Sequence, residues 1–230
     1  MKRLSPLEGY DLYAGNYRKD HPYLDTFMEG AESESWIRAL DALLADRPKV
    51  VAVDAGCGDG RTLGRWARRM EKHELLDRVE LWGLDFSPKM IEAARGRVKG
   101  AKWQVVDVGN LAAVAEWAQT HGPADLVSAF FLVVHFDRPE RFFRCMKGFL
   151  SPGGRLVMNT IPQPKAPELR ASGKPVMIEA YDHTAEEMIF CGEEAGFVLT
   201  HRQDFTEANQ LISTLLEWTL PGGPAAVTAE

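Results

Sequence analysis

The chain has 230 residues, of which 45% are hydrophobic and 26% are charged, and its formal net charge at pH 7 is −6. This length suits one α/β domain with some additions, and the apolar fraction is enough for an ordinary buried core. The negative charge argues against nucleic acid as a partner, because phosphate binding needs a net supply of Lys and Arg. No apolar run is long enough to cross a bilayer and no secretory signal is visible, so we expect a cytoplasmic protein with no membrane partner.

The cysteines, Cys57, Cys145 and Cys191, are odd in number and widely separated. This spacing indicates neither a disulfide framework nor a set of metal ligands. We therefore expect buried or partly buried free thiols and no bound metal ion.

Residues 1–46 are predicted to form an N-terminal helical lid. Aromatic residues cluster between Tyr10 and Phe27, and apolar residues between Trp36 and Leu44 have the spacing of one helix face. Pro48 ends this helical region, and a strand pattern begins directly after it.

Residues 47–220 are predicted to form the main domain, in which short apolar runs alternate with helical patterns. The expected strands cover residues 50–53, 81–84, 103–106, 126–131, 156–158, 197–200 and 211–216. Ser87 and Pro88 supply an N-cap and a first-turn proline for one of the intervening helices. This alternation predicts an α/β fold, with a Rossmann-like, doubly wound, mostly parallel seven-stranded sheet and helices on both of its faces.

Prolines interrupt the alternation over residues 161–182, so we expect a long proline-rich insertion there without a regular helix. Long loops inside a compact domain are often functional. Thr184 and Glu187 predict a capping box for the next helix. Residues 221–230 are predicted to be a disordered tail.

A glycine-rich turn follows the first strand of the domain, in the stretch Asp54-Ala55-Gly56-Cys57-Gly58-Asp59-Gly60. Glycines at alternating positions allow a tight turn and a close approach to a ligand, because no Cβ stands in the way. Asp85 ends the next strand, where a carboxylate can accept hydrogen bonds from both hydroxyls of a ribose. Asp107 ends the third strand, where it can accept from an adenine amino group while the Val108 N–H donates to the ring. Together these positions predict a nucleoside site.

NAD binding is disfavoured by the spacing of the glycines. The dinucleotide fingerprint G-x-G-x-x-G would require a glycine at position 61, which is Arg61. The third glycine is Gly60 instead.

Taken in order, these motifs resemble the class I S-adenosylmethionine-dependent methyltransferases, especially the small-molecule branch that includes ubiquinone-biosynthesis-like enzymes. The motifs that match this family lie at residues 51–60, 85–86, 107, 125–130, 150–154 and 195–197, and its N-terminal Y-D-x-x-A-x-x-Y pattern starts at Tyr10. The resemblance implies methyl transfer with S-adenosyl-L-methionine as cofactor and S-adenosyl-L-homocysteine as product. It implies that glycines 56, 58 and 60 lie beside the methionine part, that Asp85 binds the ribose and that Phe86 lies against the adenine. The full set of implied donor-binding residues is Tyr17, Asp54, Gly56, Gly58, Gly60, Asp85, Phe86, Asp107, Val108 and Phe130.

His135 is the candidate general base. It follows the fourth strand, where acceptors lie in this fold, and an imidazole titrates near neutral pH. A structural histidine at the start of a loop is the alternative, and His183, Tyr13 and Tyr181 are weaker candidates for contact with the acceptor. A base is needed only when the acceptor arrives protonated, because the sulfonium donor is already activated and the protein mainly aligns it and excludes water.

Two departures from the family pattern bear on the acceptor. Val134 stands before His135 where the branch often has a polar residue, and the N-P-P-Y motif of adenine and glutamine N-methyltransferases is replaced by residues 128–131. The leading hypothesis is therefore a small-molecule methyltransferase. An RNA-directed methyltransferase and a donor-binding protein without catalysis remain the alternatives, and the sequence gives no oligomeric state.

A basic stripe on one predicted helix bears on the RNA alternative. It consists of Arg61, Arg65, Arg68 and Lys72. We expect these side chains to form a solvated helix exterior.

Overall fold

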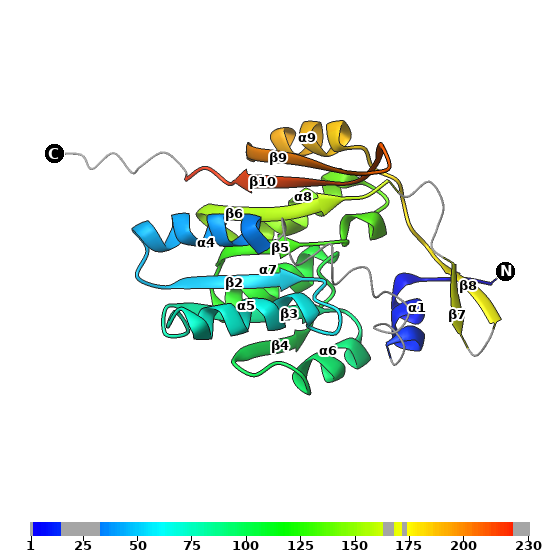
Figure 1. Ribbon diagram of the computed structural model, residues 1–230, viewed down its shortest axis with the longest axis horizontal. Helices are drawn as coiled ribbons and strands as arrows, with labels where there is room; N and C mark the ends of the chain where they lie inside the picture. Colours follow the sequence, from blue (N-terminus) through cyan, green and yellow to red (C-terminus); the bar gives the residue numbers. More distant parts are fainter. Residues whose placement is uncertain (1, 15–32, 163–167, 172–173, 223–230) are drawn as a thin grey trace.

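The computed structural model describes residues 2–14, 33–162, 168–171 and 174–222 of the chain. Its centre is a seven-stranded sheet with the strand order β4-β3-β2-β5-β6-β10-β9 (Figure 1). The strands are β2 (Val50–Ala55), β3 (Val79–Asp85), β4 (Ala101–Val105), β5 (Ala124–Ala129), β6 (Leu150–Thr160), β9 (Val198–Glu207) and β10 (Gln210–Thr219). Strands β2 to β6 are parallel, whereas β10 runs antiparallel to both β6 and β9. The predicted fold class is confirmed.

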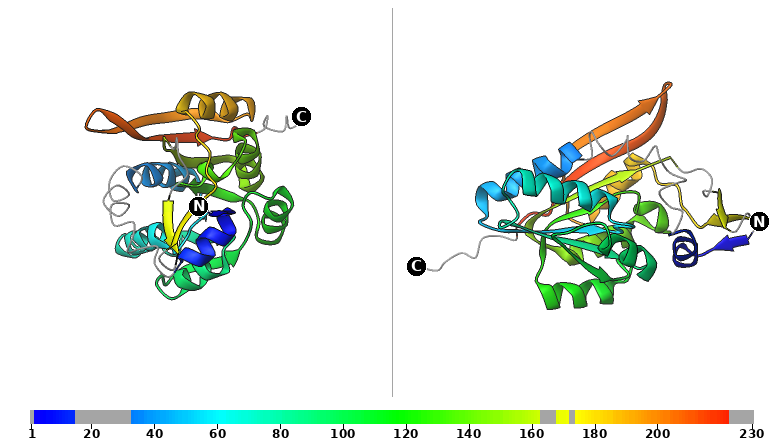
Figure 2. Two further views of the ribbon diagram at one scale, coloured as in Figure 1. Left: turned by 90° about the vertical axis from the view of Figure 1, so that its right-hand side faces the viewer. Right: turned by 60° about the horizontal axis from the view of Figure 1, so that its bottom comes forward.

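Helices cover both faces of this sheet (Figure 2). They are α4 (Ser33–Asp46), α5 (Arg61–Lys72), α6 (Pro88–Arg95), α7 (Leu111–His121), α8 (Pro139–Phe149) and α9 (Ala185–Glu194). Neighbouring residues of one strand point to opposite faces, so Leu156 joins the core cluster under α7 and α8 while Val157 joins the cluster under α4 and α5. The central strands are therefore apolar on both sides, as expected for a covered parallel sheet.

Helix α4 belongs to the core, which corrects part of the predicted lid. Trp36 of α4 stacks on Trp66 of α5 with ring centroids 4.2 Å apart, and both side chains are buried. Burial of two indoles stabilises the packing of these helices against the sheet. Residues 15–32 of the predicted lid lie outside the described part of the chain, whereas residues 2–14 lie within it.

Residues 2–14 lie beyond the carboxyl ends of the parallel strands, together with a small second sheet (Figure 1). That sheet has the order β1-β8-β7, formed by Lys2–Leu4, Lys174–Ile178 and Glu168–Ala171. Helix α1 (Pro6–Tyr13) follows β1, and Ser5 and Glu8 form its capping box. Leu4, Val176 and Ile178 make a small buried cluster of their own.

Two sequence predictions are corrected by this sheet. The chain begins with a strand and not with a helix, and the segment predicted as an irregular proline-rich insertion contains two strands. Local periodicity could not reveal them, because β1 pairs with a strand more than 170 residues away. The fourth strand also ends at Ala129, earlier than expected, and the short 3-10 helix η2 (Val133–His135) follows it.

Several local predictions are confirmed. The hydroxyl of Ser87 accepts a hydrogen bond from the Met90 N–H, as an N-cap should. The hydroxyl of Thr184 accepts one from the Glu187 N–H, which is the N-cap half of the predicted capping box. The three cysteines are buried thiols. Within the described part of the chain, no helix combines the length and the apolar character that a membrane span requires.

We expect Gly83→Ala to destabilise the protein, because a Cβ on this β3 residue would lie 2.2 Å from Cζ3 of the Trp103 ring. Overpacking of this kind lowers the free energy of unfolding by about 1–3 kcal/mol, which urea denaturation measures. Gly96→Ala is the matched control, since its Cβ would meet nothing closer than 3.7 Å in a right-handed backbone conformation. Equal stability of the two variants would contradict the close approach at Gly83.

Candidate functional site

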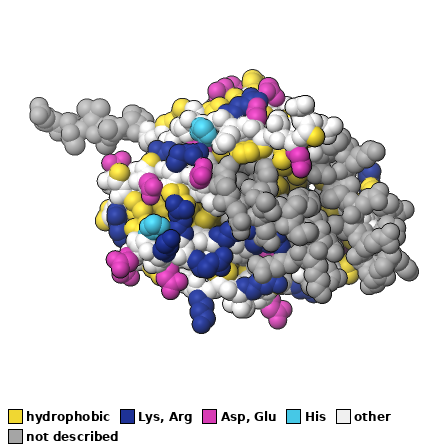
Figure 3. Space-filling model, in the orientation of Figure 1, with side chains coloured by type: hydrophobic (Ala, Val, Ile, Leu, Met, Phe, Trp, Pro, Cys, Tyr) yellow, Lys and Arg dark blue, Asp and Glu magenta, His cyan; other side chains and the backbone are white. Residues whose placement is uncertain are grey.

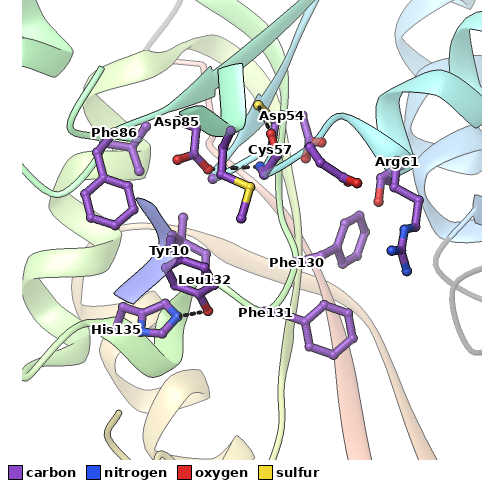
Figure 4. Close-up of a pocket in the computed structure, with 16 residues that line it drawn as sticks. Tyr10, Asp54, Cys57, Arg61, Asp85, Phe86, Phe130, Phe131, Leu132 and His135 are labelled. Carbon is purple, nitrogen blue, oxygen red and sulfur yellow. Dashed lines mark hydrogen bonds between the residues drawn. The ribbon is translucent and has the colours of Figure 1, made fainter. Parts of the chain in front are cut away.

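The ends of β2, β3 and β5 open onto a cleft. The strand order reverses direction between β2 and β5, which is where ligands bind in doubly wound sheets. Figure 4 shows the side chains that point into this cleft. The lining residues are Tyr10, Asp54, Gly56, Cys57, Gly58, Asp59, Arg61, Thr62, Asp85, Phe86, Met90, Val108, Phe130, Phe131, Leu132 and His135.

The glycine turn between β2 and α5 depends on left-handed backbone conformations. Gly56, Gly58 and Gly60 have φ values of 72°, 53° and 74°, which L side chains rarely adopt. A Cβ on Gly60 would also lie 2.7 Å from the Trp103 ring, and one on Gly56 would lie 2.8 Å from Leu132. The turn therefore requires glycine, and it presents bare backbone to the cleft.

Asp85, at the end of β3, fixes this turn. Its Oδ2 accepts a hydrogen bond from the Gly58 N–H and its Oδ1 accepts one from the Ser87 N–H, both at 2.9 Å. Burial raises the pKa of this carboxyl to about 6, while the two N–H donors act in the opposite direction. Each oxygen keeps a further lone pair, so the carboxylate can still accept hydrogen bonds from a ligand.

Asp54, at the end of β2, is a second buried acid in the cleft. Its Oδ1 accepts a hydrogen bond from the Ser128 hydroxyl at 2.9 Å. The pKa of Asp54 is raised to about 7, mainly by burial; the hydrogen bond from Ser128 acts in the opposite direction, and the charge of Asp85 adds to the rise. Burial also raises the pKa of the neighbouring Cys57 thiol, which therefore stays neutral. Two acids close together in a dry site are well placed to receive polar or cationic ligand groups.

The predicted adenine end of the cleft is formed by Phe86 of the β3–α6 turn and by Val108. Phe86 is half-buried and Val108 is buried. Asp107 is exposed, its Oδ1 accepts the Gly109 N–H at 2.9 Å, and it is not among the lining residues. Tyr17 lies outside the described residues.

The opposite wall carries a hydrogen-bonded Tyr–His pair. The hydroxyl of Tyr10 lies 2.8 Å from Nε2 of His135, and Nδ1 of His135 lies 3.2 Å from the carbonyl oxygen of Glu179. A carbonyl can only accept, so the neutral imidazole carries its proton on Nδ1 and Nε2 accepts from Tyr10. Burial lowers the pKa of His135, which keeps the ring neutral at pH 7. His135 therefore presents the basic form that the sequence hypothesis required.

Tyr10 is held next to His135 because two hydrogen bonds fix the position of the N-terminal segment. The Glu179 N–H donates to the Leu4 carbonyl within the small sheet. The hydroxyl of Ser87, which caps α6, donates to the carboxylate of Asp11 in α1. The second contact joins α1 to the residue whose N–H binds Asp85, so both walls of the cleft share one network.

Phe130 and Phe131 both line the cleft. Phe130 packs against Trp66 with centroids 6.1 Å apart. Phe131 has a φ of 55°, which is rare for a bulky residue, and its N–H donates to the Asn159 side chain at 2.7 Å. The Asn159 amide in turn donates to the Ser213 hydroxyl at 3.1 Å, which holds this conformation in place.

Arg61 corrects the prediction of a fully solvated basic stripe. It is the first residue of α5, only 8% of it is exposed, and it lines the cleft. The helix period placed Arg61 on the outer face, but the adjoining turn directs the first residue of the helix inward. Arg68 and Lys72 are exposed, as predicted.

Other lining residues gave no clear sequence signal. Asp59 is buried and pairs with Arg97 beyond α6, a contact between segments that only the fold brings together. His183, a weaker candidate for contact with the acceptor, is buried and is not among the lining residues. Its Nε2 lies 2.8 Å from the Phe136 carbonyl oxygen, which is a structural contact. Among the described residues no group of His, Cys, Asp and Glu could hold a metal ion.

The raised pKa of Asp54 predicts a pH-dependent stability. The folded state binds this proton more tightly than the unfolded state, so the stabilising contribution is present at low pH and is lost as the pH rises through about 7. Relative to Asp54→Asn, the wild type should gain up to about 1.4 kcal/mol per pH unit as the pH falls from about 7 towards 5. Urea denaturation over this range measures the difference. A difference between the wild type and Asp54→Asn that stays constant over this pH range would refute the buried carboxyl.

Comparison with known proteins agrees with the motifs. Residues 53–156 match the family described as "Methyltransferase domain". Trans-aconitate 2-methyltransferase of Methylobacterium radiotolerans is 28% identical over 60% of this chain and 48% of its own length. Indolepyruvate C-methyltransferase of Streptomyces griseus is 28% identical over 84% of this chain and 55% of its own. A probable tRNA methyltransferase 9B of Mus musculus is 27% identical over 62% and 28%. The chain thus spans about half or less of the length of these curated relatives.

Solved structures show the same fold. A TehB-like S-adenosylmethionine-dependent methyltransferase of Corynebacterium glutamicum superposes with a TM-score of 0.60 at 16% identity, covering 90% of this chain and 98% of its own. The [4+2]-cyclase SpnF superposes with a TM-score of 0.57 at 18% identity, covering 94% and 95%. Residues 53–156 thus resemble the methyltransferase domain family, and the chain has the fold of the class I S-adenosylmethionine-dependent methyltransferases, as its motifs predicted.

Proposed function

We propose that this protein transfers a methyl group from S-adenosylmethionine to a small-molecule acceptor. One observation carries the proposal: a single cleft joins the glycine turn and Asp85 on one side to the Tyr10–His135 pair on the other. A donor held against the first wall faces an acceptor held against the second. Methyl transfer needs this alignment, because it is an in-line displacement between two bound molecules.

The cleft fits the donor in three respects. The glycine turn leaves open space at Gly58, where a Cβ would meet nothing within 4 Å. The Asp85 carboxylate retains acceptor capacity for two ribose hydroxyls, and Phe86 and Val108 supply an apolar wall for a purine. In this proposal Gly56, Gly58 and Gly60 hold the donor's methionine part, Asp54 and Phe130 line the same region, and Asp107 with Val108 bind the edge of the adenine. When bound, the donor supplies an activated methyl group on a sulfonium.

His135 and Tyr10 are the candidates for proton transfer. Because the Nδ1 proton of His135 is held by the Glu179 carbonyl, Nε2 is the basic atom, and it accepts from the Tyr10 hydroxyl. An acceptor hydroxyl or acidic C–H bound next to Tyr10 can pass its proton to Tyr10 as Tyr10 passes its own to His135. The pair therefore suits a phenol, an enol or a carbon acid as the acceptor. The closed apolar wall of Phe130, Phe131 and Leu132 would exclude water.

Two of the curated relatives support a small acceptor, whereas a third is named as a tRNA methyltransferase. Trans-aconitate and indolepyruvate, named for two of them, are small organic acids, and the second is methylated on carbon. The charges give less support to an RNA acceptor. Arg61 is buried and so does not contribute to an exposed basic stripe. On the face shown in Figure 3, Lys and Arg side chains are interspersed with Asp and Glu. SpnF, named as a cyclase, shows that this fold also serves reactions other than methyl transfer. Formation of S-adenosylhomocysteine with an acceptor would distinguish our proposal from that alternative.

Calorimetry tests the donor site. We expect S-adenosylmethionine and S-adenosylhomocysteine to bind and NAD not to bind. Asp85→Asn should weaken both by about 10-fold or more, because the ribose hydroxyls lose a charged partner. An unchanged affinity would remove Asp85 from the site, and binding of NAD in place of the donor would overturn the proposed function.

Kinetics test the proton-transfer pair, with acceptors drawn from a screen of phenols and enolisable keto acids. His135→Gln should lower kcat by about 10²- to 10⁴-fold, and Tyr10→Phe should lower it in the same direction, while the affinity for S-adenosylhomocysteine stays unchanged. With saturating donor, the wild-type kcat should fall as acidity protonates His135, below the ordinary imidazole value of about 6.5 because burial lowers its pKa. This acid limb should disappear in His135→Gln. A full rate with Gln at position 135 would show that His135 is structural.

A further inference from the structure

Phe131 has an unfavourable backbone conformation at the wall of the cleft. Its φ of 55° lies in the left-handed region, which a bulky residue seldom adopts. A glycine would adopt this conformation without steric cost, yet the chain carries an aromatic side chain that lines the cleft. Such conformations persist only where the surrounding structure enforces them, and they concentrate at binding and catalytic sites. The Phe131 ring is therefore a candidate for ligand contact.

Asn159, near the end of β6, enforces this conformation. It is only 1% exposed, and its Oδ1 accepts the Phe131 N–H at 2.7 Å. Its Nδ2 donates to the Ser213 hydroxyl at 3.1 Å, and that hydroxyl donates to the Thr160 carbonyl at 3.2 Å. Both polar atoms of the Asn159 amide are thus used within a buried network. The direction of Oδ1 is fixed, and with it the backbone that carries the Phe131 ring.

The Phe131 ring lies at the acceptor end of the cleft. Figure 4 shows Phe131 and His135 at the same end, away from Asp85. Tyr10 packs edge-on against the His135 ring, with centroids 5.3 Å apart, so this end combines a polar hydroxyl with aromatic surface. A flat acceptor can place its hydroxyl against Tyr10 and its ring against Phe131. Aromatic rings attract one another in stacked and edge-to-face geometries by more than the burial of area provides, whereas a saturated ring gains burial alone.

We propose that Phe131 selects acceptors built on a flat aromatic ring, and that Asn159 is the positioning residue that directs the Phe131 ring towards the acceptor. This inference rests on the proposed function and deepens it by naming the aromatic class of acceptor. Asn159 is not among the residues that line the cleft, so it acts through Phe131. Replacing either residue should change the affinity for an aromatic acceptor and leave the affinity for the donor product unchanged.

Two alcohols that differ in ring saturation provide the test. 4-Methylphenol carries its hydroxyl on an aromatic ring, and trans-4-methylcyclohexanol carries it on a saturated ring of similar size. NMR titration would give the dissociation constant of each for protein saturated with S-adenosylhomocysteine, whose own affinity calorimetry would give. The variant Phe131→Leu keeps an apolar side chain without the ring. The control Phe190→Leu changes a phenylalanine of α9 that is 66% exposed and outside the cleft.

We expect Phe131→Leu to weaken 4-methylphenol by about 3- to 10-fold and trans-4-methylcyclohexanol by less than about 2-fold, because only the first loses a ring contact. Phe190→Leu should bind all three ligands as the wild type does. Equal losses for the two alcohols, or a wild type that does not bind 4-methylphenol, would overturn the inference and leave the donor site standing. Failure of the wild type to bind S-adenosylhomocysteine would instead reject the proposed function.

Asn159→Leu tests the positioning role. It should weaken 4-methylphenol as Phe131→Leu does, whereas Asn159→Asp, which keeps an oxygen for the Phe131 N–H, should restore most of the affinity. Thr160→Val is the matched control, since it removes a different buried hydrogen bond at the end of β6, from the Thr160 hydroxyl to the His183 carbonyl at 2.7 Å. Thermal unfolding would show which variants are folded, and Phe131→Leu tests the ring whether or not Asn159→Leu folds.

In the Phe131→Leu background, Asn159→Leu should weaken 4-methylphenol no further, because the ring that it positions is already gone. A further loss as large as that in the wild type would make Asn159 a structural residue and overturn its positioning role. The same loss of 4-methylphenol affinity in Thr160→Val would overturn it as well.

Discussion

The carboxylate of Asp85 is the contact on which the rest of the site depends. It accepts the N–H of Gly58 from the turn after β2 and the N–H of Ser87 at the start of α6. One side chain therefore sets the position of two successive strand-to-helix connections. Ser87 extends the network to Asp11 of α1, so the N-terminal segment is held against the same point. The two walls of the cleft are positioned by a short chain of polar contacts, not by packing alone.

The burial of two acids in the cleft is unfavourable in free energy, and a bound ligand can offset part of this penalty. Two carboxyl groups, Asp54 and Asp85, are buried near each other, and burial raises the pKa of both. Desolvated charges of like sign are unfavourable unless hydrogen-bond donors or cations approach them. A ligand with hydroxyl groups and a positive charge supplies both, which is the composition of the proposed donor. The same burial keeps His135 neutral, so the low polarity of the cleft favours ligand binding on one wall and a basic imidazole on the other.

The fold and the geometry of the glycine turn with Asp85 could be predicted from the sequence because their signals are local. The glycine turn, Asp85 and the N-cap Ser87 each depend on residues within a few positions along the chain. The small sheet could not be predicted in this way, since β1 and β8 pair across most of the chain and neither has a strong periodicity. The outward orientation predicted for Arg61 is wrong for a related reason. The helical period assigns residues to faces well in the middle of a helix, but at the first residue of α5 the preceding turn determines the direction of the side chain. The contact between Tyr10 and His135, 125 residues apart, was likewise visible only once the sheet had placed them.

The division of the site along the chain explains why the donor is easier to identify than the acceptor. The donor wall, from Asp54 to Val108, lies within residues 53–156, the segment that matches the methyltransferase domain family. His135 also lies in that segment, while Tyr10 and Glu179, its two hydrogen-bond partners, lie before and after it. Both partners depend on the small sheet, in which β1 and β8 are joined. Family resemblance therefore carries information about the turn that we propose to hold the donor, whereas the groups proposed to meet the acceptor come partly from segments outside the matched region. Under the proposed function, a chain that kept residues 53–156 and changed the small sheet would keep the donor-binding turn and meet its acceptor with different residues.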